Sequence, residues 1–303
     1  MLRLVCLCLI FGLLGLPATA ERQFLGYGRL LNNDSVLGDG QDRWHTGSIA
    51  ASRVWGGGWQ GALPTRPGDL LELRLNFQVI APTQLGLLNP ADRPYAGALS
   101  VGAHTHFDWH GWDAAMGADL VITGPQTHMT DVQEGLHNLI GFNEITNAVR
   151  DSQIPNGVHP TAVVELGRSF DTGTGQVRPF SEWRVGAETL WRVGVDVILG
   201  EFGRGELLVR DPVTGQRYRT IWNTQARGSS FVVGADVAGV HSSVFLPGNG
   251  TYRATDIRTR LRAGWHWQND HTALFYGITW MSPEFTPQSE GQVVGSIRIR
   301  RRF

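Results

Sequence analysis

The chain has 303 residues and a formal net charge of −1, with 26 basic residues against 27 acidic ones. This balance lacks the basic excess that nucleic-acid binding requires, so nucleic acid is excluded as an expected partner. After Ala20 no run of about 18 apolar residues occurs, which excludes a predicted membrane-spanning helix. All the basic residues other than histidine are arginines, so any anionic ligand would be held by guanidinium groups.

Residues 1–20 have the layout of a secretory signal peptide. A basic start and an apolar core precede Ala18-Thr19-Ala20, which predicts cleavage after Ala20. Cys6 and Cys8 both lie in this segment, so the processed chain is expected to contain neither a disulfide nor a thiol nucleophile. We assign residues 21–303 to one domain, because no internal repeat or low-complexity linker divides them.

Strict alternation of apolar and polar residues recurs along the chain. Residues 71–79 alternate without exception, and residues 257–265 place Arg258, Arg260 and Arg262 on one face. Three arginines on one face suit a hydrated lumen and not a sandwich core. The pattern predicts an all-β protein, a closed antiparallel transmembrane β-barrel of about twelve strands. The expected strands lie near residues 22–32, 46–56, 69–81, 94–108, 111–123, 160–170, 179–189, 191–201, 228–240, 253–267, 271–282 and 292–303.

An even strand count with both chain ends in the periplasm fixes the side on which each connection lies. The first three outward-facing loops are then residues 33–45, 82–93 and 124–159, and the connection 202–227 is expected on the periplasmic side. Several tryptophans near strand ends are candidates for interfacial girdles, with ordinary core aromatics as the alternative: Trp55, Trp59, Trp109, Trp112 and Trp280.

The third of these loops contains a predicted short helix over residues 130–141. Its apolar residues Val132, Leu136, Leu139 and Ile140 recur at helical spacing and form one stripe. Gln133 and His137 stand one turn apart at the edge of that stripe, directed toward whatever the helix packs on. The alternative readings are a capping box between Thr130 and Gln133, and a packed, hydrogen-bonded His137.

The first outward-facing loop is rich in oxygen ligands. It contains Asn33, Asp34, Asp39 and Asp42, which can bind a hard cation such as Ca²⁺. The D-x-D-x-D-G spacing of an EF-hand is absent, and a solvated, turn-rich loop is the alternative because Asn, Asp and Gly also favour turns. A barrel brings the first and third loops to the same rim, so His137 can meet this loop.

A second candidate for metal binding lies on a predicted strand. His104, His106, Asp108 and His110 alternate on one face, near the periplasmic end of the barrel. We interpret them as lumen-surface residues, with a metal site as the alternative. Neither a G-x-S-x-G nucleophile elbow nor an H-E-x-x-H zinc helix occurs in the chain.

A set of short motifs resembles the outer-membrane lipid A 3′-O-deacylases. The motifs follow the family's order through the first half of the processed chain, whereas the second half matches in strand rhythm and final aromatic residue. They are Asn33-Asp34, Asp42-Arg43, Thr46-Gly47, Asp92-Arg93-Pro94-Tyr95-Ala96-Gly97, Gly124-Pro125, Gln133 with His137, Leu139-Ile140-Gly141, and Gln153.

The resemblance implies the site residues. His137 would be the general base that activates water, and Asn33, Asp34, Thr46 and Gln133 would build the calcium and oxyanion environment, with Asn33 and Asp34 as metal ligands. Arg43 or Arg93 would hold the sugar phosphates, in place of lysines that this chain lacks. His45 stands where the family usually has an aromatic residue.

The family's glutamate six residues after the histidine is replaced here by Asn143, with Glu144 beside it. Two turns of straight helix span about 10 Å, which keeps Glu144 away from His137. A break after Gly141 would let Glu144 fold back toward the base, and we favour that arrangement.

The function expected from the resemblance is hydrolysis of the 3′-linked acyloxyacyl ester of lipid A in the outer leaflet of the Gram-negative outer membrane. The partners would be lipopolysaccharide and outer-membrane lipids, and we expect a monomer. Two alternatives remain open: a non-enzymatic barrel that serves as a channel or structural protein, and a barrel phospholipase.

Overall fold

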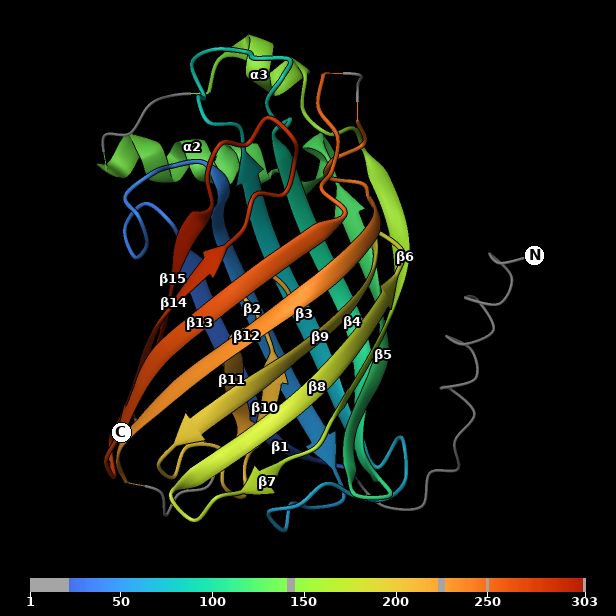
Figure 1. Cartoon of the computed structure of the whole chain (residues 1–303), viewed down its shortest axis with the longest axis vertical. Helices are drawn as coiled ribbons and strands as arrows, with labels where there is room; N and C mark the ends of the chain where they lie inside the picture. Colours follow the sequence, from blue (N-terminus) through green and yellow to red (C-terminus); the bar gives the residue numbers. More distant parts are fainter. Residues whose placement is uncertain (1–21, 141–144, 223–226, 249–250, 302–303) are drawn as a thin grey trace, which may run out of the picture.

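The computed structural model describes residues 22–140, 145–222, 227–248 and 251–301, without the side chains of residues 136–140. In this part of the chain twelve long strands form a closed antiparallel barrel (Figure 1), as predicted. They are β1 (Gln23–Asn33), β2 (Trp44–Gly56), β3 (Leu70–Ala81), β4 (Ala96–Trp109), β5 (Trp112–Thr123), β6 (Gly157–Gly167), β8 (Gly175–Val185), β9 (Glu188–Leu199), β12 (Gly228–Ser243), β13 (Ile257–Gln268), β14 (Thr272–Met281) and β15 (Gln292–Arg301).

The alternation in the sequence corresponds to the two faces of the barrel wall. Leu73 and Leu261 are 40% and 50% exposed, whereas the neighbouring Glu72 and Arg262 are buried on the lumen side. An apolar outer face around a polar interior is the arrangement of a membrane barrel. No helix among the described residues is long and apolar enough to span a membrane.

The barrel closes where its first strand meets its last. β1 and β15 pair through three register positions, Leu31–Ile297, Asn32–Ser296 and Asn33–Gly295, all at the end of β1 that leads into the first loop. The other closing contact is the pairing of β6 with β8 through six register positions, next to which the two-residue strand β7 (Phe170–Asp171) extends the sheet. The β1–β15 seam is therefore the least extensively paired line of the barrel.

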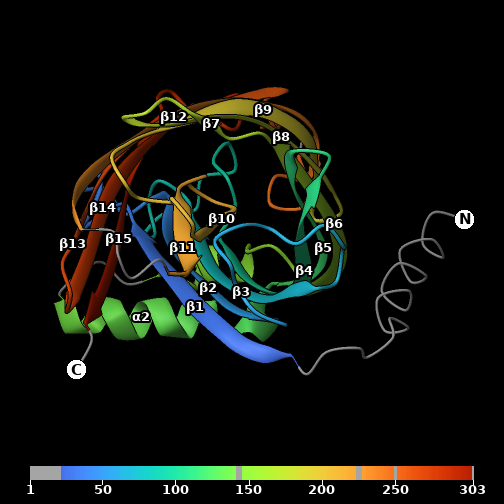
Figure 2. The same ribbon diagram turned by 90° about the horizontal axis from the view of Figure 1, so that it is seen from below.

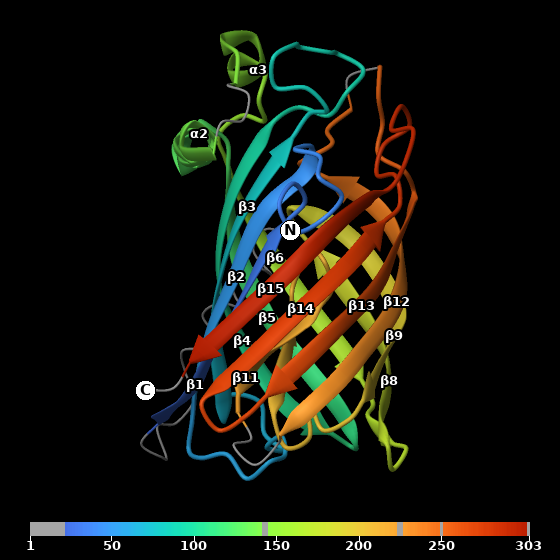
Figure 3. The ribbon, with the colours of Figure 1, turned by 90° about the vertical axis from the view of Figure 1, so that its left-hand side faces the viewer.

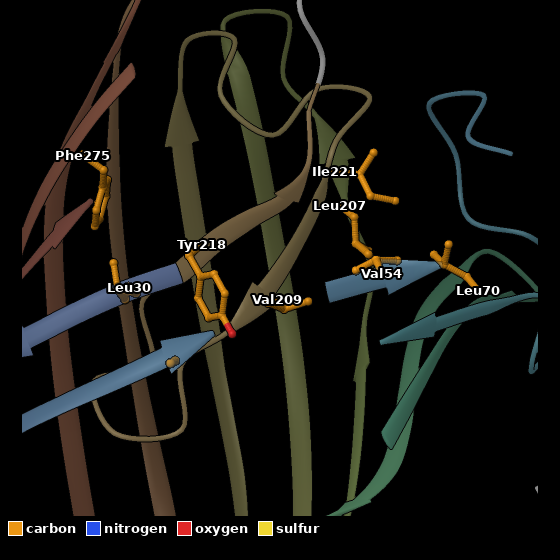
Figure 4. Packing of buried hydrophobic residues seen from close by; sticks show 9 residues of the cluster. Leu30, Val54, Leu70, Leu207, Val209, Tyr218, Ile221 and Phe275 are labelled. Atoms are coloured by element: carbon orange, nitrogen blue, oxygen red, sulfur yellow. The ribbon is translucent and has the colours of Figure 1, made fainter. Parts of the chain in front are cut away.

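The connection between β9 and β12 folds into the barrel. It leaves and re-enters the wall at the predicted periplasmic end, but β10 (Leu207–Arg210) and β11 (Arg217–Ile221) form a hairpin inside the lumen (Figure 2). We expected the whole connection on the periplasmic side. Its two ends lie there, but its hairpin lies inside the barrel. The hairpin packs on the inner wall through an apolar cluster that includes Leu30, Val54, Leu70, Leu207, Val209, Tyr218, Ile221 and Phe275 (Figure 4).

A glycine lets the hairpin approach the wall. A Cβ atom added at Gly28 of β1 would lie 2.4 Å from the Arg219 carbonyl oxygen of β11, which is a clash. Arg219 itself is buried and ion-paired with Glu206 at 2.6 Å. The lumen is thus packed along this wall.

The lumen arginines predicted from the alternation are present, but they are buried in ion pairs. Arg260 binds Asp236 at 3.0 Å, and Arg262 bridges Asp236 and Asp196. Burial of so many charges requires such partners, because an isolated buried charge is very costly. The expectation of a simply hydrated lumen is therefore wrong for this face.

Most of the tryptophans proposed as girdle residues lie on the outer wall. Trp109, Trp112 and Trp280 are 52%, 40% and 38% exposed, and the Trp55 ring contacts Phe24 edge-on at 6.0 Å. Trp59 differs, because its indole N–H donates to the Gly205 carbonyl at 2.9 Å in the segment that leads to the inner hairpin.

Candidate active site at the rim

The predicted helix is present as α2 (Met129–Ile140), after the short η2 (Pro125–Thr127) and before α3 (Asn147–Asp151). Both α2 and α3 lie at the end of the barrel opposite the start of β1 and the end of β15 (Figure 1), and α2 lies outside the rim beside β3 and β4 (Figure 3). A Cβ at Gly97 of β4 would lie 2.5 Å from the Thr127 hydroxyl and 2.7 Å from the Met129 Cβ. Glycine at this position lets the helix begin against the wall.

The polar edge of α2 is its buried face. Thr130 and Gln133 are 6% and 4% exposed, whereas Val132 of the predicted apolar stripe is 50% exposed. The helix begins before Thr130, and the Thr130 hydroxyl donates to the Gln153 side chain at 3.5 Å, so Thr130 does not occupy the predicted cap position. His137 follows Gln133 by one turn on the helix backbone. Its side chain, like Asn143 and Glu144, lies outside the described part.

Asp34 is the most deeply buried acidic residue of the loop between β1 and β2, residues 34–43. Its side chain is 0% exposed; Oδ2 accepts hydrogen bonds from the Arg43 backbone N–H at 2.9 Å and the Gln292 amide at 3.1 Å. Its Oδ1 is buried without a hydrogen-bond partner among the described residues. Burial raises the pKa of Asp34 to about 8, and the neighbouring Asp42 and Asp39 carboxylates add to the shift.

Asn33 and Thr46 are held together at the base of this loop. The Asn33 amide donates to the Thr46 carbonyl at 2.9 Å, and the Asn33 side-chain oxygen accepts from the Val36 N–H at 2.6 Å and the Ser35 hydroxyl at 3.2 Å. The Thr46 hydroxyl donates to Asp42 at 3.2 Å. The structure thus brings the predicted residues Asn33, Asp34 and Thr46 into one loop base.

The oxygen chemistry of this loop fits a hard cation at Asp34. A buried carboxylate oxygen with no hydrogen bond is a ready ligand, and a bound cation would offset the burial that raises the pKa of Asp34. The Asn33 oxygen is already engaged by two donors, so it would have to turn to become a ligand. Three or more His, Asp or Glu side chains grouped to hold a metal do not occur within the described ranges.

Gln292 at the start of β15 clamps the loop, and sequence reasoning missed it. Its side-chain amide donates to Asp34 and, at 2.6 Å, to the Arg43 carbonyl, while its oxygen accepts the His45 N–H at 3.0 Å. It is 2% exposed. Gln292 lies on the far side of the seam and is separated from Asp34 by 258 residues, so no local motif could reveal it.

Tyr95 anchors the segment after α2 to the barrel wall. It lies just before β4, is 1% exposed, and packs in one cluster with Ile145 and Val149. Its carbonyl accepts the Ile154 N–H at 2.8 Å, and burial raises the pKa of its hydroxyl. The third loop is therefore fixed at the same rim that carries the loop 34–43 (Figure 3).

The two arginines proposed for phosphate binding differ in position. The Arg43 side chain lies at the rim, stacked 4.2 Å over the Trp44 ring and paired with the exposed Glu290 at 2.9 Å. Arg93 is 2% exposed and donates to Glu284 at 2.7 Å. Arg43 therefore remains a candidate for a membrane-surface anion, whereas Arg93 is committed to a buried ion pair.

The Glu284 carboxylate lies within ion-pair distance of three basic side chains below the rim. His45 and Arg258 lie 2.9 Å and 3.3 Å from its carboxylate, in addition to Arg93. Burial alone would raise the pKa of Glu284, but these charges hold it well below its usual value. A register shift of β2 between Trp44 and Gly47 accompanies the inward position of His45, where Gln78 is its other partner at 2.9 Å.

The histidines on β4 are lumen residues, as we interpreted them. His104 contacts Asp119 at 2.9 Å and His106 contacts Glu72 at 2.7 Å, in separate pairs. The Asp108 side chain accepts the Gly111 N–H at 3.1 Å in the adjacent turn, and His110 lies in that turn with φ 54°. The four residues do not converge on one point.

We predict that Gln292→Leu loosens the loop without opening the barrel. Leucine is similar in size to glutamine but cannot form hydrogen bonds through its side chain. The substitution therefore removes three hydrogen bonds, each contributing about 1 kcal/mol. Hydrogen exchange of the amides in residues 34–46 should accelerate by roughly tenfold or more, since 1.4 kcal/mol corresponds to a factor of ten. Gln288→Leu is the matched control, because Gln288 bonds only within residues 284–290. Unchanged exchange in the Gln292 variant would contradict the clamp.

One solved structure shares this fold, and others show weaker likeness. The solved structure of LpxR from Salmonella typhimurium is similar with a TM-score of 0.72 and 17% identity, covering 93% of this chain and 100% of that one. The β domain of the Bordetella autotransporter BrkA and the NanC porin have TM-scores of 0.45 and 0.40, at 12% and 8% identity and 92% coverage of this chain, covering 99% and 100% of theirs. Among curated protein sequences none is significantly similar.

The family model described as outer membrane protein LpxR matches residues 4–303. The match spans nearly the whole chain and confirms the family resemblance predicted from the sequence. The chain belongs to the LpxR family of outer-membrane proteins.

Proposed function

We propose that this chain is a lipid A 3′-O-deacylase that hydrolyses the 3′-linked acyloxyacyl ester of lipid A in the outer leaflet, with a histidine-activated water and Ca²⁺. Membership of the LpxR family supports the substrate class. The observation that carries the chemistry is the buried Asp34 carboxylate, whose Oδ1 has no hydrogen-bond partner among the described residues, at the rim that also carries α2 with its buried Gln133 (Figure 3).

The position of the site suits an ester of a membrane lipid. The loop and α2 lie at the rim, at the outer side of the barrel wall (Figure 3). An acyl chain can stay beside the apolar wall while its ester reaches the rim. Arg43 lies at the same rim, where a guanidinium can bind a phosphate of the sugar backbone.

His137 acts as the general base in this proposal. A neutral imidazole takes a proton from the attacking water and returns it to the leaving alcohol. Gln133, one turn earlier and 4% exposed, would donate its amide to the carbonyl oxygen as negative charge develops there. Thr46 and Asn33 hold the loop base against which the ester would lie.

Asp34 would hold the cation, together with loop oxygens and, after rotation, Asn33. Bound Ca²⁺ would polarise the ester carbonyl and stabilise the oxyanion. The oxygen-only donor set and the unbonded Asp34 Oδ1 support this assignment. The loop is held by Gln292 from the opposite side of the seam, so its carboxylate is positioned before a cation arrives.

The inner hairpin and its ion pairs argue against an open channel as the alternative function, because they fill the lumen beside β1 and β2. If this chain were a barrel phospholipase, the same residues would act on a phospholipid ester. The lipid products distinguish the two.

We predict that His137→Ala leaves a folded barrel and lowers the deacylation rate by a factor on the order of 10²–10⁴, as removal of a general base does. His128→Ala is the control, since His128 is exposed just before α2 and contacts Asp131. Rates should be measured on purified, membrane-inserted protein. A near wild-type rate in the folded His137 variant would show that another group activates the water.

We predict that chelation of Ca²⁺ abolishes activity and that Asp34→Asn raises the half-saturating Ca²⁺ concentration by about tenfold or more, a cost of at least about 1.4 kcal/mol in binding. Direct titration of Ca²⁺ binding provides a readout that does not depend on turnover. Asp131→Asn, on the exposed side of α2, should bind Ca²⁺ like the wild type. Full turnover of metal-stripped protein in chelator would contradict the assignment.

We propose that Glu144 orients His137 after a break at Gly141, where glycine weakens a helix. Glu144→Gln should then slow hydrolysis sharply under saturating Ca²⁺, while Asn143→Ala has little effect. The opposite outcome, a damaging Asn143→Ala beside a silent Glu144→Gln, would make the Asn143 amide the residue that positions the base.

A further inference from the structure

The outer wall of the barrel carries a group of exposed arginines beside the β1–β15 seam. Of all Asp, Glu and Arg residues on the twelve barrel strands, three are exposed within the described ranges: Arg29 on β1, Arg53 on β2 and Arg301 on β15. These strands are consecutive around the barrel, in the order β2-β1-β15. The three arginines are therefore one cluster, which we call the seam arginines.

The seam arginines face the membrane. Arg29 lies between Gly28 and Leu30, which contact the inner hairpin, and Arg53 lies between the buried Ser52 and Val54. Alternate residues of a strand point to opposite faces, so both arginines point outward. Exposed Tyr27 and Leu31 flank Arg29 on the same face.

The arginines are close neighbours on the sheet. Tyr27 lies directly opposite Arg53 and Arg29 opposite Ala51, so Arg29 and Arg53 are diagonal neighbours, about 7–8 Å apart at Cα. The β1–β15 register stops at Leu31–Ile297, and its continuation would bring Arg301 level with Tyr27. The neighbouring Arg300 already lies 5.3 Å from the Tyr27 ring centre.

Their depth corresponds to the periplasmic leaflet. Trp55, two residues from Arg53 toward the periplasmic end of β2, contacts Phe24 and marks the interface there. Arg53 thus lies just inside the aromatic girdle, and Arg29 slightly deeper. At this depth a guanidinium group can reach the level of the lipid headgroups, where an exposed arginine costs far less than at the bilayer midplane.

The protein itself supplies no compensation for the two central charges. Arg29 and Arg53 form neither a hydrogen bond nor an ion pair with any residue that the structure describes, and no acidic residue is exposed on the barrel strands in those same ranges. Eight of the nine buried arginines in the described part of the chain are paired with carboxylates, the exception being Arg298. A phosphate from the surrounding bilayer has the charge, the depth and the bidentate geometry that guanidinium groups prefer.

We propose that the seam arginines form a binding site for the headgroup phosphate of an anionic phospholipid of the periplasmic leaflet, with its acyl chains along Leu31, Tyr27 and Ile299. A lipid bound there would cover the line where β1 and β15 share three paired positions. The site lies at the opposite end of the barrel from the rim, so it is independent of the hydrolytic function.

The test uses full-length processed protein equilibrated in detergent with equal amounts of dioleoylphosphatidylglycerol and dioleoylphosphatidylcholine, followed by native mass spectrometry. We expect wild-type protein to retain phosphatidylglycerol over phosphatidylcholine by at least about tenfold. The Arg29→Gln/Arg53→Gln/Arg301→Gln variant should lose this preference. The matched control Arg66→Gln/Arg168→Gln/Arg227→Gln removes three exposed arginines from periplasmic segments between strands and should keep it.

Folding of each variant is checked by its heat-modifiable electrophoretic mobility. If the triple variant does not fold, Arg29→Gln and Arg53→Gln are compared singly, and each should reduce the preference. Equal retention of both lipids by wild type, or an unchanged preference in folded seam variants, would overturn the proposal. Displacement of the lipid by millimolar inorganic phosphate would assign the site to free phosphate and would also overturn it.

Discussion

A sheet immersed in lipid must satisfy its backbone hydrogen bonds internally, so it has to close on itself. In this chain the closure depends on the short pairing of β1 with β15. That pairing determines much of the molecule around it. Asp34 follows β1 directly, and Gln292 begins β15, so closing the barrel is what places the clamp beside the candidate ligand. Residues 34–43 then extend the contact, since the Asp39 N–H donates to the Val293 carbonyl at 3.1 Å.

The same seam explains the position of the inner hairpin. Below Leu31 the two strands lack a paired register, and β11 packs against β1 from inside, where Gly26 and Gly28 leave room for its backbone. Trp222, just after β11, stacks against Arg300 and Arg298 of β15 at 3.9 Å and 4.5 Å. The hairpin thus contacts both edges of the seam. The rim site, the hairpin and the seam arginines all lie along one line of the barrel.

The sequence predicts the wall well because lipid on one side and a polar lumen on the other impose a period of two. Each of the twelve strands was predicted to within a few residues, and α2 was found from its helical period. Alternation does not predict the inner hairpin, because both faces of Leu207–Arg210 are buried and its sequence shows no period of two. The orientation of α2 was misjudged at Val132, since a helix beside a bilayer can expose apolar residues and bury polar ones.

The candidate site was predictable to the extent that its residues are local. Asn33, Asp34 and Thr46 belong to one hairpin, and the register of that hairpin brings them together. Two features could not be predicted: the hydrogen bond from Gln292 to Asp34 and the buried ion pair of Arg93 with Glu284. Both join residues that are far apart in the chain, and a local pattern of residues does not show such contacts. His137 is assigned by the family motif, and Glu144 by the helix break that we propose at Gly141.

The most direct test of the proposed activity is the mass spectrum of lipid A from a Gram-negative host that expresses this chain. The account predicts the loss of one acyloxyacyl unit from the 3′ position, with phospholipids unchanged. Intact lipid A, with the barrel correctly inserted and Ca²⁺ present, would contradict it, and lysophospholipid in place of deacylated lipid A would make the chain a phospholipase.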